Sequence, residues 1–182
     1  MRIGILALAA LGIAACDSGN VPSPAERLNN PNAAVEADVD PGLVLLRSDG
    51  LNAGVESFYF AAGKNEVVGA LTRVLGQPND VASLPECGAG PMESARFEGG
   101  LTVMFQDGNF VGWYQEQASD AVRLAGNGEI GTSRAELEVL PNFSMIEGST
   151  LGEEFALGDQ IGGFLEGDAV SGLYSGTQCF FR

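Results

Sequence analysis

The sequence predicts an α+β fold made of two divergent units, each a helix with an antiparallel meander, after a signal peptide and a disordered tether. Three observations predict it. An N-terminal apolar run ends at a cysteine, a polar stretch containing prolines follows, and a helical pattern succeeded by β patterns occurs twice. We expect a signal peptide over 1–15, a lipidated cysteine and flexible linker over 16–41, and a globular domain over 42–182, with repeats at 42–120 and 126–182.

The N-terminal segment has a positive charge at Arg2, an apolar run over 3–15 and then Cys16. The run is shorter than the roughly 20 residues of a transmembrane helix. An aliphatic residue and two small ones before a cysteine are typical of a bacterial lipoprotein signal, in which the cysteine is acylated and becomes the first mature residue. The alternative is an ordinary secretory signal, with Cys16 at its boundary by chance. Either way, residues 1–15 are outside the fold.

The expected location is the cell envelope, with the protein lipid-anchored and facing the periplasm. Asp17 resembles the inner-membrane retention signal of enteric bacteria. That rule does not transfer between all bacterial groups, so the choice between inner and outer membrane stays open. Residues 17–40 hold three prolines and no sustained apolar period, which predicts a flexible tether between the lipid and the domain.

The first unit begins near Gly42. Residues 43–46 are a short apolar run that predicts a buried strand, and 57–60 predict a second strand rich in aromatic residues. Residues 65–75 carry apolar side chains on one helical face, and Gly76 gives the stop signal.

The strands of the first unit follow a loop. We expect residues 79–92 to be a loop rich in proline and glycine that holds Cys87. Strands are then predicted over 93–97 and 101–106, and the Asp107-Gly108 dipeptide predicts a hairpin into a strand over 109–115.

The second unit repeats this plan. A helix is predicted over 132–140, with Thr132 or Ser133 as its N-cap and Glu136 in its first turn. Three strands are then predicted, over 150–157, 160–166 and 169–174. Local matches support a duplication, because 105–114 and 165–174 share a glycine before the aromatic position. The alternative is that glycine turns and β patterning imitate a repeat by themselves.

Charge excludes some classes of partner. The formal net charge is −15, with only 9 Lys and Arg residues and no basic cluster, so we expect no nucleic-acid binding. The same charge repels anionic lipid headgroups, so contact with the membrane is expected through the lipid on Cys16.

The other two cysteines are Cys87 and Cys179. In an oxidising compartment two such thiols usually pair, which predicts a Cys87–Cys179 disulfide. The alternative is two buried free thiols, or one reactive thiol.

Catalytic groups are scarce in this sequence. There is no histidine, which removes Ser-His-Asp and Cys-His arrangements and all histidine-based zinc sites. There is also no phosphate-binding glycine loop. Glu153 and Glu154 are adjacent, so on a strand they point to opposite faces and cannot act together. Asp107, Glu166 and Asp168 lie at expected turns, where carboxylates bond locally. We therefore expect no catalytic residues, no cofactor and no metal site.

Trp113 and Tyr114 are the residues we consider for partner binding. Most aromatic residues of the chain are expected in the core. Neighbours on a strand face opposite ways, however, so one of these two must face outward, where an aromatic side chain can anchor a partner.

The chain resembles a family of uncharacterised bacterial lipoproteins of similar length. The resemblance covers residues 46–182 and rests on five strings, at 58–64, 86–92, 99–108, 149–155 and 176–182. Family members are often labelled aspartate-semialdehyde dehydrogenase. That enzyme needs a dinucleotide-binding domain, a catalytic cysteine and a histidine base, so the residues here do not support the label.

The helix-plus-meander duplication is also similar in plan to β-lactamase inhibitor protein. Each half is similar to the small lipoprotein of the outer-membrane barrel assembly machine. This similarity implies a binding module, by architecture alone.

Two functions remain open. The first is a lipid-anchored envelope module, not an enzyme, whose partner is another envelope protein or the cell wall. The alternative is a small-molecule-binding protein or a carboxylate-dependent enzyme, which would need two carboxylates facing one pocket.

Overall fold

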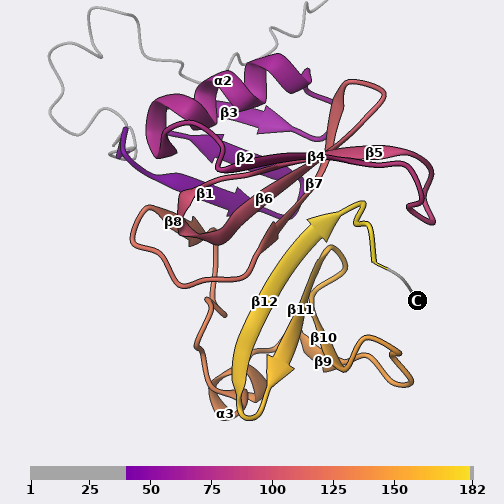
Figure 1. Ribbon diagram of the computed structural model, residues 1–182. Helices are drawn as coiled ribbons and strands as arrows, with labels where there is room; N and C mark the ends of the chain where they lie inside the picture. The colour runs from indigo at the N-terminus through magenta and orange to yellow at the C-terminus, as the bar shows by residue number, and fades with distance from the viewer. Residues whose placement is uncertain (1–39, 181–182) are drawn as a thin grey trace, which may run out of the picture. The chain divides into compact units, whose positions relative to one another are not determined.

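The computed structural model shown in Figure 1 describes residues 40–180. The expected signal peptide at 1–15, the lipidation site Cys16 and almost all of the expected linker at 16–41 lie outside this range. In the described part of the chain, no helix has both the length and the apolar character needed to cross a bilayer.

Residues 40–180 form two sheets. The smaller sheet has the strand order β3-β2-β1-β8, in which only the β1–β8 pair is parallel. Its strands are β1 (Val44–Arg47), β2 (Gly50–Ala53), β3 (Glu56–Tyr59) and β8 (Val122–Leu124).

The larger sheet is antiparallel throughout, with the order β4-β5-β6-β7-β12-β11-β10-β9. Its first four strands are β4 (Asp80–Leu84), β5 (Met92–Arg96), β6 (Leu101–Gln106) and β7 (Asn109–Gln115), with the 3-10 turn η1 (Glu98–Gly100) before β6. The other four are β9 (Phe143–Met145), β10 (Glu153–Leu157), β11 (Ile161–Glu166) and β12 (Ala169–Gly176). The last strands of the two groups, β7 and β12, pair at the centre of the sheet.

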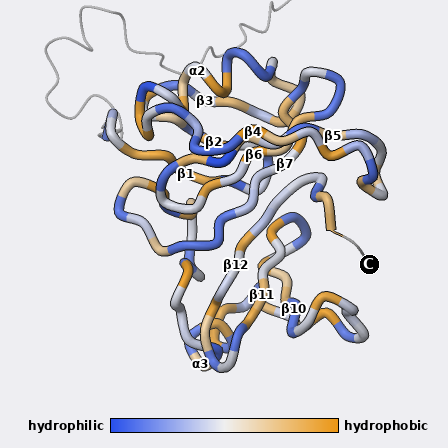
Figure 2. The backbone as a smooth tube through the Cα atoms, viewed as in Figure 1, coloured by the Kyte–Doolittle hydropathy of each residue, from blue (hydrophilic) through white to orange (hydrophobic). Residues whose placement is uncertain are grey.

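Two helices are described. α2 (Lys64–Leu75) buries Val67, Ala70 and Leu71 on one face and ends at Gly76, whose φ of 85° suits a residue without a side chain. Figure 2 shows this amphipathic character as alternating hydrophobic and hydrophilic stretches along α2. α3 (Arg134–Glu138) buries only Leu137.

The N-terminus of α3 is a capping box. The Ser133 hydroxyl accepts from the Glu136 amide at 3.3 Å, and the Glu136 carboxylate accepts from the Ser133 amide at 2.9 Å. The Ser133 hydroxyl also donates to the Glu136 carboxylate at 2.6 Å, and this bond, together with the one from the Ser133 amide, lowers the pKa of Glu136 below its ordinary value. Of the two N-cap residues that the sequence allows, the structure uses Ser133.

Each helix is tied to a hairpin by a similar set of backbone hydrogen bonds. Before α2, the chain pairs with the β6–β7 hairpin, and before α3 it pairs with the β11–β12 hairpin. The first set is Ala61 N to Phe110 O, Phe110 N to Ala62 O and Lys64 N to Gly108 O, at 2.7–2.8 Å. The second set is Gly131 N to Val170 O, Val170 N to Thr132 O and Arg134 N to Asp168 O, at 2.8–2.9 Å.

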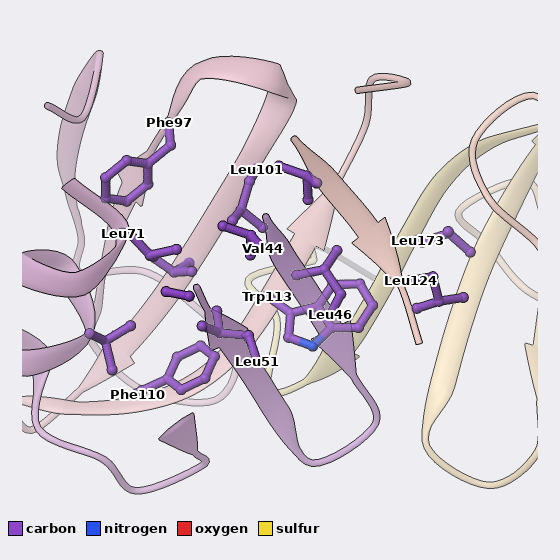
Figure 3. Close-up of a cluster of buried hydrophobic side chains, with 14 of the residues drawn as sticks. Val44, Leu46, Leu51, Leu71, Phe97, Leu101, Phe110, Trp113, Leu124 and Leu173 are labelled. Carbon is purple, nitrogen blue, oxygen red and sulfur yellow. The ribbon is translucent and has the colours of Figure 1, made fainter. Parts of the chain in front are cut away.

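A single large core joins the helices to one face of the eight-stranded sheet. It includes Leu71 of α2, Leu137 of α3, Val103 of β6 and Leu173 of β12. Figure 3 shows the indole of Trp113 beside Leu46 of the smaller sheet, within this cluster.

The expected helices, antiparallel strands and hairpins are present, and the fold is rich in β-structure, with two helices and twelve strands among the described residues. The expected loop over 79–92 contains the strand β4, and β2, β8 and β9 were not expected at all. These strands are short, and β4, β8 and β9 lie at sheet edges, so their pairing partners, and not local propensity, determine them.

Candidate functional site

The two faces of the eight-stranded sheet differ in what covers them. Side chains alternate along β6, so Val103 and Phe105 join the large core while Met104 points to the opposite face. Met104 packs there with Met92 and Cys87 in a separate small cluster. We call this opposite side, which carries neither helix, the helix-free face.

The helix-free face places two tyrosines together at the centre of the sheet. Tyr114 of β7 and Tyr174 of β12 are direct partners in the antiparallel register. Their strand neighbours Trp113 and Leu173 belong to the large core, so both tyrosines lie on the helix-free face. Direct cross-strand partners of this kind have their side chains in contact range.

Glycines on neighbouring strands form the floor beneath these rings. A Cβ built on Gly162 of β11 would overlap the ring of Tyr174, and one built on Gly172 of β12 would lie 2.7 Å from the Tyr114 hydroxyl. Close approach of each ring to the backbone therefore requires glycine at both positions.

The C-terminal segment folds back onto this face. Gly176, with φ 73°, ends β12, and Figure 1 shows the chain turning away from the tip of that strand. Gln178 then donates to Trp113 O at 2.9 Å and to Ser175 O at 2.8 Å. Cys179 forms the expected disulfide with Cys87, with 5.1 Å between their Cα atoms.

Phe180 lies among three aromatic rings of the helix-free face. Its ring centroid is 5.1 Å from Tyr174, 5.4 Å from Phe164 and 6.0 Å from Tyr114, with interplanar angles of 83°, 74° and 84°. These are edge-to-face arrangements, the favoured geometry for aromatic pairs. We call these four residues the aromatic cluster; each of them is only partly buried.

A buried carboxylate lies next to the aromatic cluster. Glu154 of β10 has no exposed surface, and it accepts hydrogen bonds from the Tyr174 hydroxyl and from Ser149 Oγ, the latter at 2.5 Å. This hydrogen bond from its hydroxyl fixes the position of the Tyr174 ring.

Tyr114 keeps its proton more tightly than a free tyrosine. Partial burial raises the pKa of its phenol, the Glu116 carboxylate raises it further, and the Arg96 guanidinium lowers it in part. At neutral pH this residue therefore presents a neutral hydroxyl.

The structure separates the two residues expected at a partner-binding surface. Trp113 is fully buried, and its indole nitrogen donates to Arg47 O at 2.8 Å, so it is a core residue and cannot contact a partner. Only Tyr114 lies on the helix-free face. Sequence reasoning missed Phe164, Tyr174 and Phe180, although Tyr174 matches Tyr114 in the suspected repeat and could have been found there.

Glu153 and Glu154 point to opposite faces, as expected for neighbours on a strand. Glu153 forms an ion pair with Arg134 at 2.7 Å, while Glu154 is buried. Of the turn carboxylates, Asp168 lies 3.9 Å from the same arginine.

Two observations on the described residues concern metal binding and paired carboxylates. No group of three His, Cys, Asp or Glu side chains in residues 40–180 could hold a metal ion. A hollow of about 300 Å³ beside β8 is lined in part by Asp120 and Glu129. Both carboxylates lie within 3.5 Å of the Arg123 guanidinium, so they are arranged as ion pairs and not as an acid–base pair.

No protein-family model, curated protein or solved structure matches this chain. The family resemblance and the remote architectural similarity drawn from the sequence therefore stay predictions.

Proposed function

We propose that this chain is a non-catalytic binding module of the bacterial cell envelope, anchored through a lipid on Cys16, and that it binds a partner through the helix-free face. The observation that carries this proposal is the aromatic cluster at the centre of that face. Partly exposed aromatic residues gathered in one place are unusual on a protein that has no partner, and tyrosine is enriched among residues that dominate binding energy.

The rigidity of this surface also favours binding. Glycines hold the two tyrosine rings close to the sheet, Glu154 accepts from Tyr174, and the Cys87–Cys179 disulfide holds the segment that carries Phe180. A surface that is ordered before binding loses little conformational entropy when a partner arrives.

We further propose that the sheet arose from two copies of one helix-plus-meander unit. The strand order supports this, because α2 precedes β4 to β7, α3 precedes β9 to β12, and the two groups meet through their last strands. The similar hydrogen bonds between each helix start and its hairpin support it as well. In this arrangement Tyr114 and Tyr174 are equivalent residues that pair at the junction of the copies.

The anchor is tested by changing its acceptor. Substitution Cys16→Ser should prevent acylation and move the protein from the membrane fraction to the soluble fraction of its cells, measured by fractionation and immunoblotting. A variant that stays in the membrane fraction to the same extent as the unsubstituted protein would contradict the lipid anchor.

The binding surface is tested by crosslinking in cells, purification and mass spectrometry of the captured proteins. Tyr114→Ala should abolish capture of the partner. Tyr59→Ala is the matched control, because Tyr59 is an exposed tyrosine on the edge strand β3. Equal capture by both variants would show that the helix-free face is not the binding surface.

A further inference from the structure

We propose that Tyr114, Phe164 and Tyr174 form a receptacle for an aromatic side chain of the partner, and that Phe180 occupies this receptacle in the free protein. The inference rests on the proposed function and deepens it by naming the chemistry of the partner. The occupant it specifies is a peptide segment with an aromatic residue close to a basic one.

The positions of the three rings of the receptacle do not depend on Phe180. Gly162 and Gly172 provide its floor, as described above, and Glu154 holds Tyr174 through the phenol hydrogen bond. Phe164 also packs on Tyr174, with 5.5 Å between ring centroids. Removal of the Phe180 ring should therefore leave the other three rings in place.

The receptacle fits a phenyl ring. Phe180 contacts all three rings edge to face, so the space between them accepts an aromatic group in its favoured geometry. The same three contacts are available to an aromatic side chain from another molecule.

Phe180 can leave the receptacle without loss of the disulfide and the hydrogen bonds that hold the C-terminal segment. The disulfide is made by Cys179 and the amide hydrogen bonds by Gln178, both before Phe180 in the chain. Among the described residues, the Phe180 side chain packs against the three rings of the receptacle. Rotation of this one residue would empty the receptacle while the segment before it stays anchored.

Charge favours a basic partner segment. The chain carries a net charge of −15. The exposed Glu166 is the last residue of β11, the strand that carries Phe164, and Glu116 directly follows β7 and forms an ion pair with Arg96. The chain's own tail has the same chemistry in sequence, because Arg182 follows two phenylalanines. Its last residues can therefore serve as a probe of the receptacle.

The test uses the full chain with the substitution Phe180→Ala and a fluorescein-labelled peptide with the sequence of residues 176–182 and the substitution Cys179→Ser. Anisotropy should show this peptide binding to the Phe180→Ala protein at least about tenfold more tightly than to the unsubstituted protein, since only the variant has an empty receptacle. A control peptide that also carries Phe180→Ala and Phe181→Ala should not bind. The Phe180→Leu protein should also bind the peptide more tightly than the unsubstituted protein does, with a smaller difference in affinity. This variant replaces Phe180→Ala in the test if the alanine variant does not fold.

The inference would be overturned if the probe peptide bound neither protein or bound both with equal affinity. It would also be overturned if the control peptide bound the Phe180→Ala protein as tightly as the probe peptide does. These results are distinct from failure of the proposed function. A partner captured through Tyr114 from cells would leave the binding face standing even when the probe peptide does not bind. Tight binding of the probe with no partner captured would support the receptacle and count against the cellular role.

Discussion

Single residues on the helix-free face show how a buried acidic side chain positions an aromatic ring. Glu154 has no exposed surface, and its carboxylate accepts from two hydroxyl groups. A buried polar group is tolerated only when it is hydrogen-bonded, so the hydroxyl groups of Ser149 and Tyr174 are required as much as the carboxyl group of Glu154 itself.

Glu154→Ala should lower the free energy of unfolding by about 1–3 kcal/mol, because it leaves the partly buried hydroxyl groups of Ser149 and Tyr174 without their acceptor. Chemical denaturation with urea measures this loss. Glu153→Ala is the matched control on the adjacent residue. It removes an ion pair between partly exposed side chains and should cost less than about 1 kcal/mol. Equal losses for the two variants would show that Glu154 does not hold the site.

Tyr114 should titrate above the ordinary pKa of a tyrosine, because it is half-buried and lies near Glu116. Ultraviolet absorbance followed against pH, with Tyr114→Phe as the reference, isolates this residue. The native state binds the phenol proton more tightly than the unfolded chain does. The contribution to stability is therefore fully present below the unfolded pKa and is lost as the pH rises through the folded pKa. A Tyr114 pKa at or below the ordinary value would contradict the described burial.

At the scale of elements, the glycines of β11 and β12 make the surface possible. Gly162→Ala should cost about 1–3 kcal/mol of stability, because the new methyl group overlaps the Tyr174 ring. It should also disturb the tyrosine signals in near-ultraviolet circular dichroism. Gly88→Ala is the control, since a Cβ there meets nothing within 4 Å, and it should change stability by less than about 0.5 kcal/mol. A Gly162→Ala protein with unchanged spectrum and stability would show that the ring does not lie on this glycine.

The elements differ in how far the sequence predicts them. The helix at 64–75 and the hairpin of β6 and β7 have strong periodicity and clear turn residues, and their prediction is confirmed. β4 has weak local signals and exists through its pairing with β5, so propensity could not find it. The sequence leaves Thr132 and Ser133 as candidates for the N-cap of α3. The hydrogen bonds of Ser133 identify it as the cap.

The aromatic cluster could be predicted only in part. Alternation along β7 correctly implied that one of Trp113 and Tyr114 faces outward, but not which one. The choice depends on which face the helices cover, and that is a tertiary property. Phe180 joins the cluster because the chain turns after Gly176 and is held by a disulfide to Cys87, a contact between residues 92 positions apart in sequence.

At the scale of the whole molecule, the described fold has one face covered by helices and the smaller sheet, and another on which aromatic residues gather. The first holds the large core and gives the fold its stability. The second carries the small sulfur-containing cluster, the C-terminal segment and the aromatic cluster. We propose that the first face maintains the structure and that the second, the helix-free face, binds the partner.

Photocrosslinking at a single residue tests that proposal most directly. The full chain, made in its own cells with p-benzoylphenylalanine in place of Tyr114, should give one discrete protein adduct on irradiation. The same group in place of Tyr59, an exposed tyrosine on β3, should not give that adduct. No adduct at Tyr114, or the same adducts at both positions, would contradict a binding module that works through the helix-free face.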